Sequence, residues 1–310
     1  MSVRMDGREN GTRTSFRTLV KITLVPVIGL AVFFTWNWLN GGETPDEAWR
    51  EFRHETQGPS PAPPPASAPA MQASAVAVTP SAPPKAAQRP HGHGGEIVLI
   101  IDDLGFQGQP LDRVMALDPN VNCAILPNGT GVTAAAEALH KRGFEILCHL
   151  PMEPMGAAAP GRGAILTSMQ DDEISRLTRE NVDAVPYARG VNNHMGSRAT
   201  ADRRVMTSVL GALPDGMYFI DSRTAGNSLA GAVARQMNIR TASRQIFLDD
   251  VQNESAVRKQ LNDLAAAAEK HGLAIGIGHP HAVTLRVLAD ELPELRARGF
   301  KLVRASSIVR

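Results

Sequence analysis

Residues 96–105 read EIVLIIDDLG: the five consecutive apolar residues Ile97–Ile101 are followed at once by two carboxylates, Asp102 and Asp103. An unbroken apolar run of this length is typical of a strand buried on both faces, as in a parallel sheet. The two acids could cap a following helix. Charge placed directly after a core strand, however, favours a functional site at the end of that strand.

Further short apolar runs follow along the chain, with helical patterns between them. The clearest helical pattern covers Glu254–Lys270, and Ser168 with Asp171 indicates the start of another helix. Strands alternating with helices predict a mostly parallel sheet. We therefore expect an α/β fold, a distorted or incomplete β/α barrel of about seven to eight parallel strands. A doubly wound open sheet is the alternative. The other predicted strands are 121–126, 144–148, 190–193, 217–220, 240–242, 273–277 and 301–303.

Ionisable side chains recur at the ends of the predicted strands. This position is informative because β/α barrels have their active sites at the carboxyl ends of the strands. Histidines and carboxylates of this kind bind zinc or a similar divalent ion. A bound metal lowers the pKa of its water to about 7, so that a carboxylate can accept a proton while a histidine protonates the leaving group. The side chains at the ends of the third, fourth, fifth and seventh predicted strands are, in that order, His149 and Glu153; Asn192, Asn193 and His194; Asp221 and Arg223; and His279 and His281.

Several of these residues also have a structural interpretation. His149 could be a hydrogen-bonded core histidine, Glu153 could pair with an arginine, and Asp221 could form an ion pair with Arg223. His140 lies near a glycine at the end of a predicted helix, which favours a structural role for it.

The N-terminal 39 residues predict a membrane anchor. Residues 1–21 are polar and contain five Arg or Lys residues, and the apolar run Ile22–Leu39 follows. Eighteen helical residues span about 27 Å, close to the hydrocarbon thickness of about 30 Å. Positive charge before the span places the N-terminus in the cytoplasm. A cleavable signal peptide and a buried soluble helix are the alternatives.

A linker is predicted between this anchor and the strands. Residues 58–90 contain ten prolines among many Ala and Ser residues, a composition that cannot bury enough apolar surface to fold. The expected organisation is a cytoplasmic segment 1–21, an anchor 22–39, a Pro/Ala-rich linker 40–95 and a barrel domain 96–310.

Composition argues against several functions. The net charge is +1 and no basic patch with interleaved aromatics is visible, which argues against nucleic-acid binding. Cys123 and Cys148 are too few for a disulfide scaffold. No Gly-x-Gly-x-x-Gly follows a strand, so a nucleotide-binding domain lacks support.

Over residues 96–310 the chain resembles the polysaccharide deacetylase superfamily, and within it the divergent branch. The resemblance implies a distorted β/α barrel and short motifs that hold a divalent metal, most often zinc. The main family's Arg-x-Pro-x-Gly motif is not recognisable. The matching segments are Asp102-Asp103, His149-Leu150-Pro151-Met152-Glu153, Asn193-His194-Met195-Gly196-Ser197, Phe219-Ile220-Asp221-Ser222-Arg223-Thr224 and Gly278-His279-Pro280-His281.

The resemblance also implies a role for each of these residues. Asp102 would be the general base, with Asp221 and His279 as further catalytic residues, although His281 could be the acid instead. The metal ligands would be Asp103, His149 and His194, with Glu153 as the alternative third ligand. Arg223, His281 and Asn193 would bind substrate. Because successive side chains of an extended strand point to opposite sides, Asp103 could hold the metal while Asp102 faces the water.

These observations predict a metal-dependent hydrolase that removes acetyl or related acyl groups from an envelope carbohydrate with metal-bound water, acting on C–N bonds other than peptide bonds. The alternative is a non-catalytic barrel that serves as a binding or regulatory module in envelope assembly. The expected location is the bacterial inner membrane, with the domain in the periplasm. Expected partners are the acylated substrate and the membrane, with room for a protein partner.

Overall fold

The computed structural model describes residues 94–310. The predicted anchor 22–39, the segment before it and nearly all of the predicted linker lie outside the described residues. Within residues 94–310, no helix combines the length and the apolar character needed to cross a membrane.

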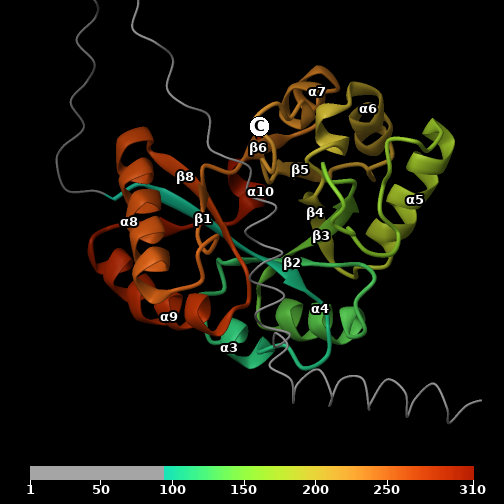
Figure 1. The fold of residues 1–310 in the computed structure, drawn as a ribbon. Helices are drawn as coiled ribbons and strands as arrows, with labels where there is room; N and C mark the ends of the chain where they lie inside the picture. Colours follow the sequence, from blue (N-terminus) through green and yellow to red (C-terminus); the bar gives the residue numbers. More distant parts are fainter. Residues whose placement is uncertain (1–93) are drawn as a thin grey trace, which may run out of the picture. The chain divides into compact units, whose positions relative to one another are not determined.

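The domain is built on one sheet in which all strand pairs are parallel. The strands follow the order β6-β5-β4-β3-β2-β1-β8-β7, with β9 paired to the start of β1. The sheet curls into an incomplete barrel, which confirms the predicted parallel α/β architecture (Figure 1). The strands are β1 (Glu96–Leu104), β2 (Asn122–Ile125), β3 (Glu145–Met152), β4 (Ala188–Met195), β5 (Tyr218–Asp221), β6 (Thr241–Ser243), β7 (Ile246–Phe247), β8 (Leu273–Gly278) and β9 (Lys301–Leu302).

Helices cover the outside of the strands (Figure 1). In α8, for example, Val257, Leu261 and Leu264 recur at helical spacing and are buried in the outer core. This confirms the helix predicted over Glu254–Lys270. The helices are α3 (Leu111–Met115), α4 (Val132–Lys141), α5 (Asp171–Asp183), α6 (Arg203–Gly211), α7 (Ala230–Gln236), α8 (Glu254–His271), α9 (Ala282–Ala297) and α10 (Ala305–Ile308), with a short 3-10 turn at Ala199–Ala201.

The start of α5 differs from its predicted form. The helix begins at Asp171, and the residue before it, Gln170, makes no side-chain capping bond, so Ser168 is not the cap. Asp171, Asp172 and Glu173 fill the first turn. Their negative charges interact favourably with the positive end of the helix dipole. This interaction stabilises the start of the helix in the absence of a capping side chain.

Alternation along the strands separates an outer core from a smaller inner core. In β1, Leu99 and Ile101 belong to the outer core, whereas Val98 and Ile100 belong to the inner one. Because side chains alternate with a period of two, Asp102 continues the inner row. His149 in β3 continues the inner row in the same way, two residues after Leu147. The barrel interior therefore ends in polar side chains at the carboxyl edge of the strands.

The opposite end of the interior is closed by α10, and we call it the closed end. Glu145 at the start of β3 accepts hydrogen bonds from the Tyr218 hydroxyl at 2.7 Å and from the Ser306 backbone N–H at 2.8 Å. Asn122 donates to the Leu99 carbonyl and accepts from the Ala305 N–H, both at 2.9 Å. These bonds fix the C-terminal helix inside the ring of strands.

The two open edges of the sheet are connected by a short segment of chain. β6 pairs with β5 and β7 pairs with β8, yet only two residues separate β6 from β7, which brings the two sheet edges within about 10 Å there. In this connection, Arg244 Nε donates to the Ser222 carbonyl at 2.6 Å, and its guanidinium lies 4.8 Å from the Phe247 ring centre. The two-residue strand β7 was not predicted from the sequence.

Candidate metal centre

Three donor atoms from three strands converge at the carboxyl edge of the barrel. Asp103 Oδ1 lies 3.2 Å from His149 Nε2 and 2.9 Å from His194 Nδ1, and the two histidine nitrogens are 3.2 Å apart. The side chains come from the carboxyl ends of β1, β3 and β4; β3 and β4 are neighbours in the sheet, and β2 lies between β1 and β3. The structure therefore brings together the three residues predicted as metal ligands; their role as ligands stays a prediction.

The donor set fits a divalent cation. Asp103 Oδ1 is buried and has no hydrogen-bond partner, although two histidine nitrogens face it. Carboxylate oxygen and imidazole nitrogen are common zinc ligands, with bonds of about 2.0–2.2 Å, so two tetrahedral ligands lie about 3.3 Å apart. The three separations are close to that value. A cation bound among these atoms would give the orphaned oxygen a partner.

The backbone at Asp103 differs from the expected extended strand end. Its φ is 59°, in the left-handed region. As a result, both carboxylates approach the same imidazole: Asp102 Oδ2 lies 3.5 Å from His149 Nε2. The prediction that Asp102 and Asp103 point to opposite sides is therefore wrong, because it assumed extended geometry through both residues.

Left-handed residues other than glycine recur along this edge. Met195, which ends β4, has φ 52°, and Arg223, which follows β5, has φ 48°. Such conformations cost about 1–3 kcal/mol each and gather at functional sites. Their presence beside Asp103 is consistent with a site at this edge.

The electrostatics of the cluster attract positive charge. Burial would raise the pKa of Asp103, but the nearby imidazoles of His149 and His194 lower it below its ordinary value. Burial raises the pKa of Asp102, although the charges of His149 and His279 oppose the shift. For His149, burial would lower the pKa, and the carboxylates of Asp102 and Asp103 raise it instead.

A histidine and an aspartate form a second pair beside the cluster. His279, after β8, points Nε2 toward Asp103 Oδ2 at 3.7 Å, and its Nδ1 lies 2.9 Å from Asp249 Oδ1. Asp249 also accepts hydrogen bonds from the His279 N–H and from the Thr284 hydroxyl. Burial would lower the pKa of His279, but the bond to Asp249 and the charge of Asp103 raise it to about 9. These two carboxylates therefore favour the protonated form of His279.

Sequence reasoning missed Asp249. A signal was present, because residues 246–250 read IFLDD and repeat the apolar run plus acid pair of residues 100–103. The run was too short to be recognised as a strand. His281 lies in the same group of donor atoms as Asp249 and His279, with its Nε2 3.0 Å from the Gln252 amide nitrogen.

Three other predicted site residues are placed around the cluster. Asp221 is buried, and its carboxylate accepts from the Arg223 N–H at 2.8 Å and the Ser228 hydroxyl at 2.9 Å, so it shapes its own loop. Its contact with Arg223 is through the backbone and is not the ion pair considered above. Arg223 itself is exposed. Asn193 is fully buried, and its amide oxygen accepts from the Ser222 N–H at 2.9 Å, which places it inside the protein and not on the surface of the site.

Glu153, the alternative ligand, is engaged elsewhere. Its carboxylate accepts from the Thr167 N–H at 2.6 Å and hydroxyl at 2.7 Å, and lies 3.4 Å from Arg198 Nε. This agrees with the structural interpretation, in which it pairs with an arginine.

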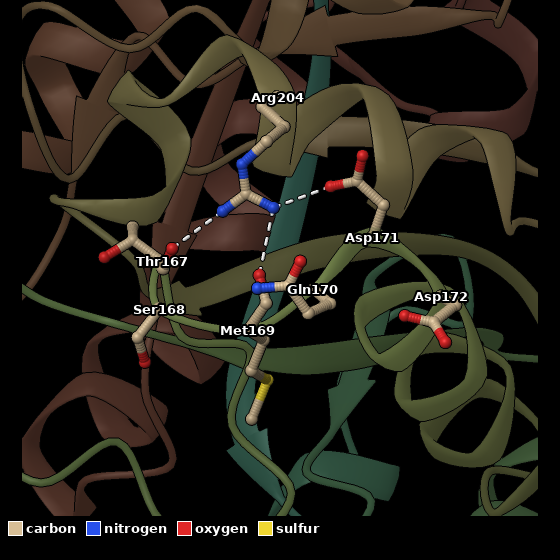
Figure 2. Close-up of a pocket in the computed structure, with 7 residues that line it drawn as sticks. All are labelled: Thr167, Ser168, Met169, Gln170, Asp171, Asp172 and Arg204. Atoms are coloured by element: carbon tan, nitrogen blue, oxygen red, sulfur yellow. Dashed lines mark hydrogen bonds and ion pairs between the residues drawn. The ribbon is translucent and has the colours of Figure 1, made fainter.

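A hollow of about 540 Å³ opens on the other side of Thr167, beside the start of α5. Figure 2 shows Arg204 reaching across it to the Thr167 and Met169 carbonyls and to the Asp171 carboxylate. These contacts neutralise the guanidinium, and none of the residues lining the hollow belongs to the metal cluster. We therefore assign this hollow no chemistry.

Comparison with known proteins shows which family the chain matches. Residues 99–309 match the family described as divergent polysaccharide deacetylase. The uncharacterized protein YibQ of Escherichia coli (strain K12) is 38% identical over 216 residues, covering 69% of this chain and 67% of that protein. An uncharacterized protein of Haemophilus influenzae is 35% identical over 201 residues, covering 64% of this chain and 72% of that protein.

Among solved structures, an uncharacterized protein from Agrobacterium tumefaciens C58 superposes with a TM-score of 0.67 at 22% identity, covering 71% of this chain and 92% of that one. This likeness shows the fold alone. The family match covers more than half of the chain and includes every residue of the three-donor cluster. The chain therefore belongs to the divergent polysaccharide deacetylase family.

Proposed function

We propose that this protein is a metal-dependent hydrolase that removes acetyl or related acyl groups from an envelope carbohydrate. The observation that carries the proposal is the convergence of Asp103, His149 and His194 within 3.2 Å of one another, with the Asp102 carboxylate and the His279 imidazole beside them. Family membership supports the carbohydrate part of the proposal.

Each residue has a chemical part in this proposal. Asp103, His149 and His194 would hold the cation, for which zinc fits the donor types best. The chemistry that a divalent cation supplies at such a site is polarisation of the acyl carbonyl and a lower pKa for water. Asp102, whose pKa burial raises, would accept the proton of the attacking water.

The acid in this proposal is His279. Its pKa of about 9 keeps it protonated at neutral pH, and Asp249 holds the opposite ring nitrogen. The protonated Nε2 faces the cluster and would donate its proton to the leaving amine or alkoxide. His281 lacks such a carboxylate bond, and burial lowers its pKa, so the acid role falls to His279.

Metal analysis combined with hydrolysis assays tests the proposal. The full-length protein should bind stoichiometric zinc and hydrolyse at least one of three substrate types: N-acetylated glycans, O-acetylated glycans or generic acetyl esters. Asp103→Asn should lose both zinc and turnover, because one ligand is gone. If zinc-loaded protein hydrolyses none of the three, the enzyme proposal fails and a binding module becomes the better explanation.

We also propose that the domain faces the periplasm from an inner-membrane anchor. The support is the sequence pattern of residues 1–47, in which Arg and Lys precede the apolar run Ile22–Leu39 and Asp and Glu follow it. A reporter fused after Arg310 should be active only in the periplasm. Cytoplasmic activity of the reporter would reverse the proposed orientation.

A further inference from the structure

Asn192 is a buried amide that touches both the proposed base and a proposed metal ligand. Its side-chain nitrogen donates to Asp102 Oδ1 at 2.8 Å, and its oxygen lies 2.9 Å from His149 Nδ1. The residue is fully buried in β4 and lies opposite His149 in the pairing of β4 with β3. A third contact, 3.3 Å to the Ser222 hydroxyl, ties the same nitrogen to the end of β5.

With Asp102 ionised, as its proposed role as the base requires, the three groups allow only one arrangement of protons. An ionised Asp102 can only accept, so the amide must present its NH₂ group to it. The amide oxygen then faces His149, and an oxygen can only accept, so His149 Nδ1 must carry a hydrogen. The lone pair of the neutral imidazole therefore lies on Nε2, the atom that faces Asp103 and His194.

We propose that Asn192 is the positioning residue that couples the base to the metal ligand: one amide fixes the His149 tautomer that leaves Nε2 free to bind a cation, and holds Asp102 beside it. The inference rests on the proposed function, in which His149 binds the cation and Asp102 is the base. The arrangement itself concerns hydrogen positions that can be measured without turnover. Partners of this kind behind a ligating histidine typically contribute roughly 10–100-fold to metal affinity.

Two substitutions separate positioning from mere packing. Asn192→Leu keeps the volume and removes both hydrogen bonds, so zinc affinity should fall roughly 10–100-fold. Asn192→Asp loses the donor to Asp102 but keeps an oxygen for the His149 N–H, so its zinc affinity should fall clearly less than that of Asn192→Leu. Chelator competition gives both values. Equal losses in the two variants would show that only packing matters and would overturn the proposal.

Asn122→Leu is the matched control. Asn122 is also a fully buried barrel asparagine with two hydrogen bonds, but it lies at the closed end. This variant should melt at a lower temperature and bind zinc as tightly as wild type. A comparable loss of zinc affinity in Asn122→Leu would assign the Asn192→Leu effect to general destabilisation.

A direct measurement covers the case in which Asn192→Leu does not fold. Imidazole nitrogen shifts of metal-free wild-type protein, recorded at alkaline pH and assigned with His149→Ala, should show hydrogen on Nδ1 of His149. Hydrogen on Nε2 would overturn the proposal. If the wild type binds no zinc while His149 shows Nδ1–H, the proposed function fails and the positioning of His149 by Asn192 stands.

Discussion

The two ends of the barrel interior are both polar and buried, but their polar atoms are satisfied differently. At the closed end, the Glu145 carboxylate receives hydrogen bonds from Tyr218 and Ser306, and the Asn122 amide is bonded at both ends. At the opposite end, which we call the open end, Asp103 Oδ1 is buried among histidine nitrogens without a hydrogen-bond partner.

This difference separates a structural network from a binding site. A buried polar group usually finds its partners within the protein, and an exception calls for a specific explanation such as an ion. The closed end meets that rule and needs nothing further. At the open end, the buried oxygen of Asp103 obtains a partner only when a cation is added. The proposed acid, the proposed base and the Asn192 amide all lie beside the three donor atoms that would hold this cation.

The sharpest test of the comparison removes the base from the open end. Asp102→Asn should lower turnover about 10²–10⁴-fold, the usual contribution of a general base. Zinc content should be unchanged, because Asp102 is outside the three-donor cluster. Steady-state rates and metal analysis of the same sample measure both. Full activity in this variant would show that another group is the base.

The next test asks whether the open end depends on metal for stability. In wild type, zinc at 100 times its Kd should add about 2.7 kcal/mol to the free energy of unfolding. His149→Ala should show no such gain, since a ligand is missing. Thermal melts with and without chelator measure it, with His140→Ala as the control because its ring stacks on Tyr187 outside the site. Zinc stabilisation that persists in His149→Ala would contradict the proposed ligand set.

The closed end should respond in the opposite way. Glu145→Ala leaves the buried Tyr218 hydroxyl without its acceptor, which should lower the free energy of unfolding by about 1–3 kcal/mol. The zinc Kd should not change, because the closed end contributes no metal ligand. Denaturant unfolding and chelator competition give the two values. A weakened zinc site would mean that the two ends are coupled and the division between them is false.

The smallest expected effect concerns the pH profile. His279 acts as an acid only while protonated, so activity should fall as pH rises through its pKa, which is about 9 in the absence of a cation. Asp249→Asn removes a charge that raises this pKa, so the alkaline limb should move to lower pH by about one unit. The kcat/KM profile measures the shift. A limb that stays in place or moves upward would rule out His279 as the acid.

Much of the open end could be predicted from the sequence because it lies on strands. Unbroken apolar runs such as Ile97–Ile101 predict a buried strand, and the carboxyl ends of parallel strands share one edge, so Asp103, His149 and His194 could be brought together without coordinates. The order of the strands was not needed for that inference.

Other features depend on geometry that a residue pattern does not contain. β7 has two residues, too few to show periodicity, and Asp249 was missed with it. The left-handed backbone of Asp103 breaks the alternation on which its direction was predicted. The role of Asn192 follows from two contacts across three strands, and in the sequence it cannot be told from Asn193 beside it.

The left-handed φ of Asp103 also restricts which residues could replace it. Aspartate and asparagine tolerate this conformation, whereas most other side chains lose about 1–2 kcal/mol in it. A glutamate, equally able to bind a cation, would meet that cost in addition to its extra methylene. The backbone conformation thus limits the residue types at this position independently of metal binding. A substitution that conserves the charge, such as Asp103→Glu, is disfavoured there by conformation.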